Sequence, residues 1–112
     1  ENGNATFVSI NFNNNSMIIE ESTESLFSTV SKVKLLNSTN KKENTYTFEG
    51  VAKNIYTAKN KIAINLGSEI HFIDTNGWLI KKYTTKQEAR NIVISDKIAG
   101  IVYRDKIEII KL

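Results

Sequence analysis

Apolar and polar residues alternate with a period of two over much of this chain. Between residues 61 and 66, Ile62, Ile64 and Leu66 fall on one side of an extended segment. Such alternation is typical of a half-buried β-strand, and the Gly67-Ser68 pair that follows is typical of a hairpin turn. The pattern predicts four short antiparallel strands in the middle of the chain, at 54–57, 61–66, 69–74 and 78–85.

The same pattern recurs along the chain with a period of 37 residues. Segments 33–36, 70–73 and 107–110 read VKLL, IHFI and IEII, and each runs apolar, polar, apolar, apolar. Tyr46 falls over Tyr83 at the same spacing, and one-residue slips near Lys59 and Gly100 complete the alignment. A four-stranded meander cannot bury both of its faces alone, so repeated meanders are expected to stack on one another.

This repeat predicts an all-β fold made of about two and a half four-stranded antiparallel blades of a β-propeller. Propeller blades are repeats of about 40 to 50 residues arranged radially. We expect one propeller fragment over residues 1–112: an incomplete blade at 1–50 with a long hairpin insertion, a complete blade at 51–87 and an incomplete C-terminal blade at 88–112. The first blade would lack its first strand and the last blade its fourth. A β-sandwich or a small barrel is the alternative.

The first third of the chain is less regular than the rest. Residues 6–12 alternate as a strand should, and we place them as the second strand of their blade. The insertion at 13–31 is either an elongated hairpin or a short helix. In the helical reading Leu26, Phe27 and Val30 share one face, with Ser22 or Thr23 as the N-cap.

Composition narrows the functional classes. The net charge of +3 is spread along the chain, whereas nucleic-acid-binding surfaces cluster their cations, so we expect no nucleic-acid partner. The sequence has no cysteine, which excludes disulfides and thiolate chemistry. It also lacks an apolar run long enough to cross a bilayer, so we expect no membrane contact by this segment. The first residue is Glu1, and we expect the chain to be a piece of a longer protein.

The single histidine, His71, is the first candidate for chemistry. The repeat places it in the position of Lys34 in the preceding copy and Glu108 in the next. A position that accepts Lys, His and Glu is expected to be a solvated site on a strand, so we assign His71 no catalytic or metal-binding role. We expect His71→Ala to leave folding nearly unchanged.

Acidic residues are the next candidates. Asp74 opens the oxygen-rich DTNG segment, but a calcium loop needs several carboxylates at alternating positions and a closing Glu. We therefore expect Asp74 to form a turn. Glu20, Glu21 and Glu24 form an acidic cluster in the insertion, which we interpret as a solvated loop; a weak cation or partner site is the alternative.

Trp78 follows the DTNG turn and begins the fourth strand of its unit. We expect the indole to cover its own blade. The alternative is an exposed side chain that contacts a partner or a sugar.

Residues 51–112 carry a family resemblance. The IDTNG turn, the RNIVIS strand and the terminal AGIVYRDKIEIIKL resemble the C-terminal end of uncharacterised, membrane-anchored β-propeller-like (WD40- or quinoprotein-like) proteins of clostridia and other Firmicutes. The resemblance implies a propeller fold on the extracytoplasmic, cell-surface side of a bacterial membrane, and it carries no catalytic residue across. Residues 1–50 match only loosely.

We therefore expect a non-catalytic binding or scaffold module, with no catalytic, cofactor-binding or metal-binding residue and no cofactor. Its partner would be a protein, peptide or glycan. The alternatives are a fragment of a propeller enzyme whose catalytic residues lie in other blades, or a self-contained β-sandwich. Because an apolar edge strand that carries Ile107, Ile109 and Ile110 needs a cover, we also expect the isolated chain to self-associate.

Overall fold

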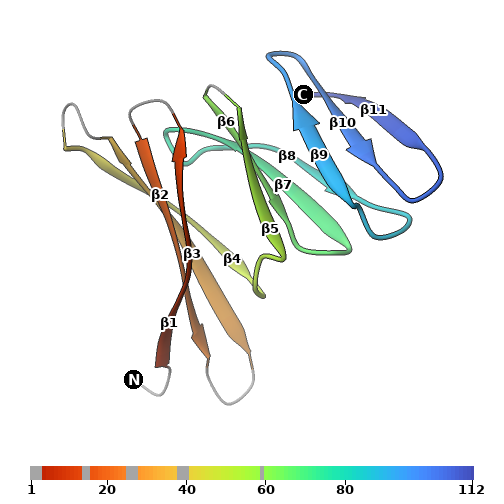
Figure 1. Ribbon diagram of the computed structural model, residues 1–112. Helices are drawn as coiled ribbons and strands as arrows, with labels where there is room; N and C mark the ends of the chain where they lie inside the picture. The colour runs from red at the N-terminus through yellow and green to blue at the C-terminus, as the bar shows by residue number, and fades with distance from the viewer. Residues whose placement is uncertain (1–3, 14–15, 25–27, 38–40, 59) are drawn as a thin grey trace. The chain divides into compact units, whose positions relative to one another are not determined.

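A computed structural model describes residues 4–13, 16–24, 28–37, 41–58 and 60–112, and these residues form strands and turns with no helix (Figure 1). The all-β prediction is confirmed. The strands of the described residues are β1 (Asn4–Asn13), β2 (Ser16–Glu24), β3 (Thr29–Asn37), β4 (Glu43–Glu49), β5 (Asn54–Ala58), β6 (Lys61–Asn65), β7 (Glu69–Asp74), β8 (Leu79–Thr84), β9 (Asn91–Ile94), β10 (Ile98–Val102) and β11 (Ile107–Lys111).

The strands build three antiparallel meanders in two compact units. The first unit, Glu1–Val51, contains the first sheet, in the order β1-β2-β3-β4. The second unit, Ala52–Leu112, contains the second sheet, β5-β6-β7-β8, and the third sheet, β9-β10-β11. Within each sheet every strand pairs with its neighbours in sequence, because turns of a few residues bring consecutive strands together.

The first sheet corrects the strand count expected from the sequence. It has four strands rather than three, and residues 6–12 lie in its first strand, β1, rather than its second. The insertion is the long β2–β3 hairpin, whose register runs from Ser16 opposite Asn37 to Glu24 opposite Thr29. The helical alternative is wrong for Ser22, Thr23 and Val30, which lie in strands; Leu26 and Phe27 lie outside the described residues.

Alternation explains the buried side of the first sheet. Val33 and Leu35 of β3 are buried, as are Ile18 of β2 and Phe48 of β4. Lys32 and Lys34, which point to the other face, remain exposed or half-exposed. Ser22 and Ser31 are buried as well, and their hydroxyl oxygens lie 2.8 Å apart in a hydrogen bond that offsets the cost of removing them from water.

In the second unit, the second and third sheets pack face to face around one apolar cluster. The second sheet contributes Ala63, Ile70 and Phe72, and the third sheet contributes Ile92, Ala99 and Ile101 with Tyr103. Full burial of a large apolar side chain such as Phe72 stabilises a fold by about 1.5–3 kcal/mol. This cluster is therefore the main source of cohesion between the two sheets.

The pairing register repeats between these two sheets at the 37-residue spacing. Ile64 pairs with His71 in the second sheet, and Ile101 pairs with Glu108 in the third. The backbone hydrogen bonds before them repeat too: Lys53 N donates to Asn65 O and Arg90 N to Val102 O, both at 2.7 Å. The expected one-residue slip near Gly100 is therefore wrong, because β10 keeps the spacing of 37 throughout.

The third strand of each sheet carries the repeated apolar pattern. Val33 lies in β3, Ile70 in β7 and Ile107 in β11. Tyr46 pairs with Val33, and Tyr83 pairs with Ile70, so the fourth strands of the first two sheets also share one register. The predicted equivalence of the three positions is confirmed.

Candidate functional site

In the second unit, one apolar face of the third sheet lies open to solvent. Val93, Ile98, Ile107 and Ile109 are 60%, 43%, 64% and 62% exposed. They share one side of the third sheet because they alternate with the buried Ile92, Ala99 and Ile101. With Gly100 and Val102 they line a shallow hollow of about 230 Å³. We call this side of the third sheet the outer face.

The repeat identifies the counterpart of the outer face. Ile107 and Ile109 occupy the positions that Ile70 and Phe72 hold in the second sheet, and Gly100 occupies that of Ala63. In the second sheet these residues are fully buried beneath the third sheet. The outer face therefore carries apolar residues at the positions that are buried between sheets in the preceding repeat.

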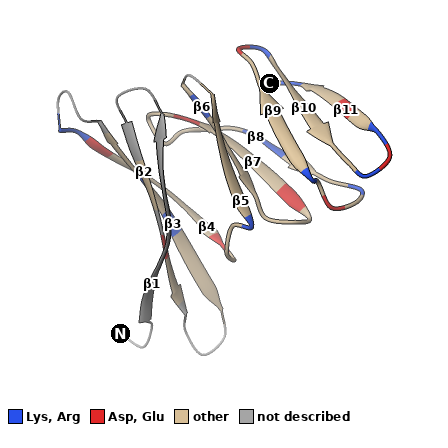
Figure 2. Cartoon of the chain, viewed as in Figure 1, with Lys and Arg blue, Asp and Glu red and all other residues tan. Residues whose placement is uncertain are grey.

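The charges of the third sheet lie mainly outside its first two strands. β9 and β10 contain no charged residue (Figure 2). The exposed side chains of Asp96 and Lys97 lie in the β9–β10 turn, and those of Arg104, Asp105 and Lys106 in the β10–β11 turn. An apolar centre with a charged rim is the arrangement found in protein–protein interfaces.

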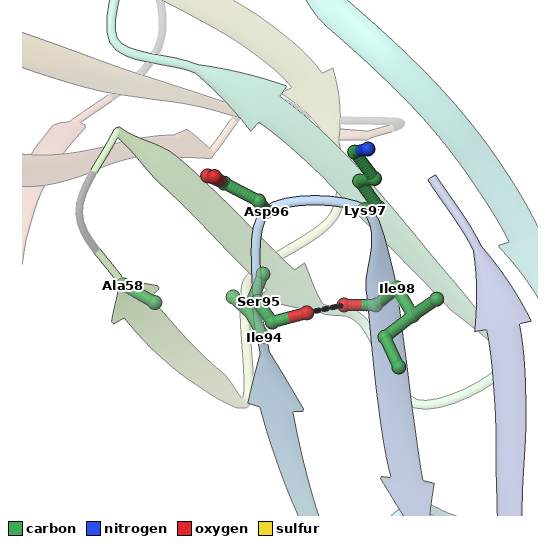
Figure 3. Close-up of a pocket in the computed structure, with 6 residues that line it drawn as sticks. All are labelled: Ala58, Ile94, Ser95, Asp96, Lys97 and Ile98. Atoms are coloured by element: carbon green, nitrogen blue, oxygen red, sulfur yellow. Dashed lines mark hydrogen bonds between the residues drawn. The ribbon is translucent and has the colours of Figure 1, made fainter.

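A hollow of about 570 Å³ lies beside the β9–β10 turn (Figure 3). Ala58, Ile94 and Ile98 give it apolar walls, and Ser95, Asp96 and Lys97 complete its lining. The turn is closed by Ser95 N, which donates to Ile98 O at 2.9 Å, and by the Ser95 hydroxyl at 3.2 Å from the same oxygen. Because Ser95 and Ile98 also line the outer face, this hollow extends the apolar surface past the end of the sheet.

A tyrosine–carboxylate cluster joins the second and third sheets. Tyr83 of β8 donates its hydroxyl hydrogen bond to Glu108 Oε2 on β11, and the Tyr103 hydroxyl donates to Glu108 Oε1 at 2.9 Å. These hydrogen bonds favour the charged form and lower the pKa of Glu108. Burial, and then the bond to Glu108, raise the pKa of Tyr103 to about 12, and the bond to Glu108 raises the pKa of Tyr83.

The tyrosine–carboxylate cluster was not found from the sequence, where Glu108 was assigned to a solvated position. The signal that could have found it is the repeat of Tyr46 at Tyr83, which marks a conserved register in the fourth strands. Its geometry is that of a cross-link between sheets: both carboxylate oxygens are engaged by hydroxyl donors.

The solvated position expected for His71 is wrong. Its residue exposure is 4%, and Nε2 lies 2.7 Å from Glu69 Oε1. The reason is that β7 is buried on both faces, with Ile70 and Phe72 on one side and His71 and Ile73 on the other. The hydrogen bond from His71 lowers the pKa of Glu69, and the charges of His71 and Lys82 act in the same direction.

The turn assigned to Asp74 is confirmed. Asp74 Oδ1 accepts hydrogen bonds from the backbone N–H groups of Asn76 at 2.9 Å and Trp78 at 3.0 Å. Gly77 closes the turn with a φ of 82°, a left-handed conformation that glycine adopts without strain.

Trp78 is 72% exposed, so the expectation that the indole covers its own blade is wrong. It directly precedes β8, whose first residues, Leu79 and Ile80, are also exposed. The side chain is placed there because the DTNG turn holds the Trp78 amide at the edge of the second sheet.

The acidic insertion is described only in part. Glu21 forms an ion pair with Lys34 at 3.2 Å, with both side chains about a third exposed, whereas the side chains of Glu20 and Glu24 lie outside the description. The loop expected there is replaced by strand β2.

Among the residues that the structure describes, no three His, Asp or Glu side chains gather in a group that could hold a metal ion. None of these residues forms a helix that could cross a membrane.

Comparison with known proteins identifies the family. Residues 2–112 match DUF5711, a family of unknown function, and the chain belongs to that family. No curated protein and no solved structure matches the chain.

Proposed function

We propose that this member of the DUF5711 family is a non-catalytic binding and scaffold module of a β-propeller-like stack, and that the outer face is its interaction surface. The observation that carries the proposal is the exposure of Ile107 and Ile109 at positions whose counterparts, Ile70 and Phe72, are fully buried between sheets. A surface with the composition of a buried interface gains free energy when it is covered.

The partner that suits this surface is another protein surface. The four exposed aliphatic side chains offer no hydrogen-bonding groups of their own, so their recognition depends on shape and on removal of apolar area from water. In the isolated chain the available partner is a second copy, whose outer face can pack against the first about a two-fold axis.

The cell-surface location implied by the sequence resemblance is part of the proposal. It is tested by adding a protease to intact cells of the source bacterium and following the protein with an antibody. Degradation in intact cells supports an extracytoplasmic location. Complete protection, with degradation only after lysis, contradicts it.

Single cysteines test the interaction surface itself, because the chain has none of its own. Val93→Cys and Ile109→Cys place a thiol on the outer face, and Leu79→Cys places one at an exposed apolar position of the second sheet. The rate of maleimide labelling should fall at least about threefold for the two outer-face thiols as the protein concentration rises from micromolar to millimolar, while Leu79→Cys should not change. Equal rates for all three at every concentration would contradict the proposal.

A second candidate function rests on Trp78. An exposed indole beside Leu79 and Ile80 is a surface on which the apolar face of a sugar ring can stack. Trp78 is the chain's only tryptophan, so its fluorescence reports contact directly. A saturable change in this fluorescence with cell-wall glycan fragments would favour this function over the first; a flat titration would exclude glycan contact at Trp78.

A further inference from the structure

The third sheet differs from the other two at one edge. β3 pairs with β2 and β4, and β7 pairs with β6 and β8. β11 occupies the same position in the third sheet but, among the strands that the structure describes, pairs with β10 alone. The edge of β11 that faces away from β10 is therefore unpaired, whereas the equivalent edges of β3 and β7 pair with β4 and β8.

The backbone groups available at this edge follow from the ladder on the other side. Tyr103 N donates to Lys106 O at 2.8 Å, and Leu112 N donates to Lys97 O at 2.9 Å. Hydrogen-bonded pairs alternate along an antiparallel ladder, so Glu108 and Ile110 also bond to β10. The N–H and C=O groups of Ile107, Ile109 and Lys111 therefore point away from β10, toward the open edge.

We propose that β11 accepts an extended polypeptide segment as an antiparallel fourth strand, with a tyrosine opposite Ile107. The register comes from the other sheets, where Tyr46 lies opposite Val33 and Tyr83 opposite Ile70. In both cases a threonine follows the tyrosine. The inference rests on the proposed function, because the incoming tyrosine would lie on the outer face beside Ile107 and Ile109. This is recognition by strand addition.

The charges at the edge favour an acidic segment. Arg104, Lys106 and Lys111 are exposed around β11 and outnumber Asp105, whose carboxylate accepts a hydrogen bond from Gln87 at 3.3 Å, while the carboxylate of Glu108 is engaged by two tyrosines. In the register given above, a segment with the sequence of β4, ENTYTFE, would place its last glutamate opposite Arg104 and its first opposite Ile110, next to Lys111 along the strand. Two β11 edges from separate copies would instead bring lysines together, which disfavours edge-to-edge pairing.

The probe is an end-blocked peptide with the sequence of residues 43–49, added to the ¹⁵N-labelled chain. We expect saturable changes at the amide signals of Ile107, Ile109 and Lys111. The control peptide, with serine in place of tyrosine, should bind at least about threefold more weakly. Changes confined to other strands, or none at millimolar peptide, would overturn the proposal.

A pair of variants separates the backbone from the side chain. Ile109→Ala keeps the outward N–H, and Ile109→Pro removes it without interrupting the ladder to β10, a position where an edge strand tolerates proline. The proline variant should bind the peptide at least about tenfold more weakly than the alanine variant; equal binding would overturn the proposal. Should Ile109→Pro fail to fold, Ile107→Pro against Ile107→Ala is the same comparison.

The outer face and the edge can be tested apart. Val93→Lys places a charge on the outer face far from the β11 backbone, so it should reduce self-association and leave the peptide-induced changes on β11. If the cysteine labelling shows no protection and the peptide still binds β11, the proposed function fails and the edge assignment stands. If labelling shows protection and β11 does not respond to the peptide, the edge assignment fails alone.

Discussion

Tyr83 on β8 donates a hydrogen bond to Glu108 on β11, and so links the last strand of the second sheet to the last strand of the third. Tyr103 engages the other carboxylate oxygen. The bond joins two sheets that are also held together by an apolar cluster and by the hydrogen bond from the Tyr56 hydroxyl to Arg90 O, and it is directional where the cluster is not. It therefore fixes the orientation of the third sheet, and with it the outer face.

Removing the hydrogen bond between Tyr83 and Glu108 should change how the free energy of unfolding depends on pH in the acid range. The pKa of Glu108 is lowered in the folded state, so the link contributes stability at pH values above the ordinary pKa of 4.5 and loses it as the pH falls through the lower folded value. Glu108→Gln and Tyr83→Phe should both reduce the free energy of unfolding at pH 7 and flatten its decline below pH 4.5. Urea unfolding at several pH values measures this; unchanged profiles would contradict it.

The raised pKa of Tyr103 predicts how the stability of the chain declines at alkaline pH. Burial and Glu108 raise its pKa from 10.0 to about 12, so the folded state holds the proton more tightly than the unfolded state does. The resulting stability is present below pH 10 and is lost as the pH rises toward 12. Tyr103→Phe should show a smaller fall in stability between these values. A parallel decline in both proteins would argue against it.

His71→Ala should now destabilise the chain, contrary to the expectation from the repeat. The imidazole is 4% exposed and bonded to Glu69, and removing a buried, bonded side chain costs about 2 kcal/mol or more. Lys34→Ala, at the equivalent position of the first sheet, removes a partly exposed ion pair and should cost under about 1 kcal/mol. Denaturant midpoints compare the two; equal losses would mean that the burial of His71 has no consequence.

Asp74→Ala should cost about 1 kcal/mol, because two backbone N–H groups lose their acceptor in the turn. Asp74→Asn keeps the acceptor oxygen, and Asn37 occupies the equivalent position in the repeat, so the asparagine variant should retain most of the stability. Thermal unfolding of the two variants decides the matter. An asparagine variant as unstable as the alanine variant would contradict the turn assignment.

Sequence reasoning found the strands, the meanders and the positions related by 37 residues, because these depend on alternation and turn chemistry that are local in the chain. It was wrong about the slip near Gly100, where sequence similarity and strand pairing give different alignments of the repeat. The KIA segments at 61–63 and 97–99 match with a slip of one residue, yet Ile62 corresponds to Ala99 in the pairing, which keeps the spacing of 37. It failed at His71 for a related reason, since burial of the second face of β7 depends on tertiary packing that no residue type in that position reveals.

The sequence predicts an apolar edge on the last strand but not the other residues of the outer face. The need to cover Ile107 and Ile109 follows from the edge pattern of the last strand, and the structure finds both exposed. Ile110, expected at the same edge, packs instead against the apolar cluster between the sheets. The part played by Val93 and Ile98, and the link from Tyr83 to Glu108, join residues from separate strands and required the pairing register.

Sedimentation equilibrium of the isolated chain tests the central claim, that the outer face is an interaction surface, most directly. A monomer has a mass of 12.7 kDa. We expect the apparent mass of the wild-type chain to rise with concentration in the micromolar range, and that of Ile109→Lys to remain at the monomer value because a charge there opposes burial of the face. A wild-type chain that stays at 12.7 kDa at every concentration would contradict the account.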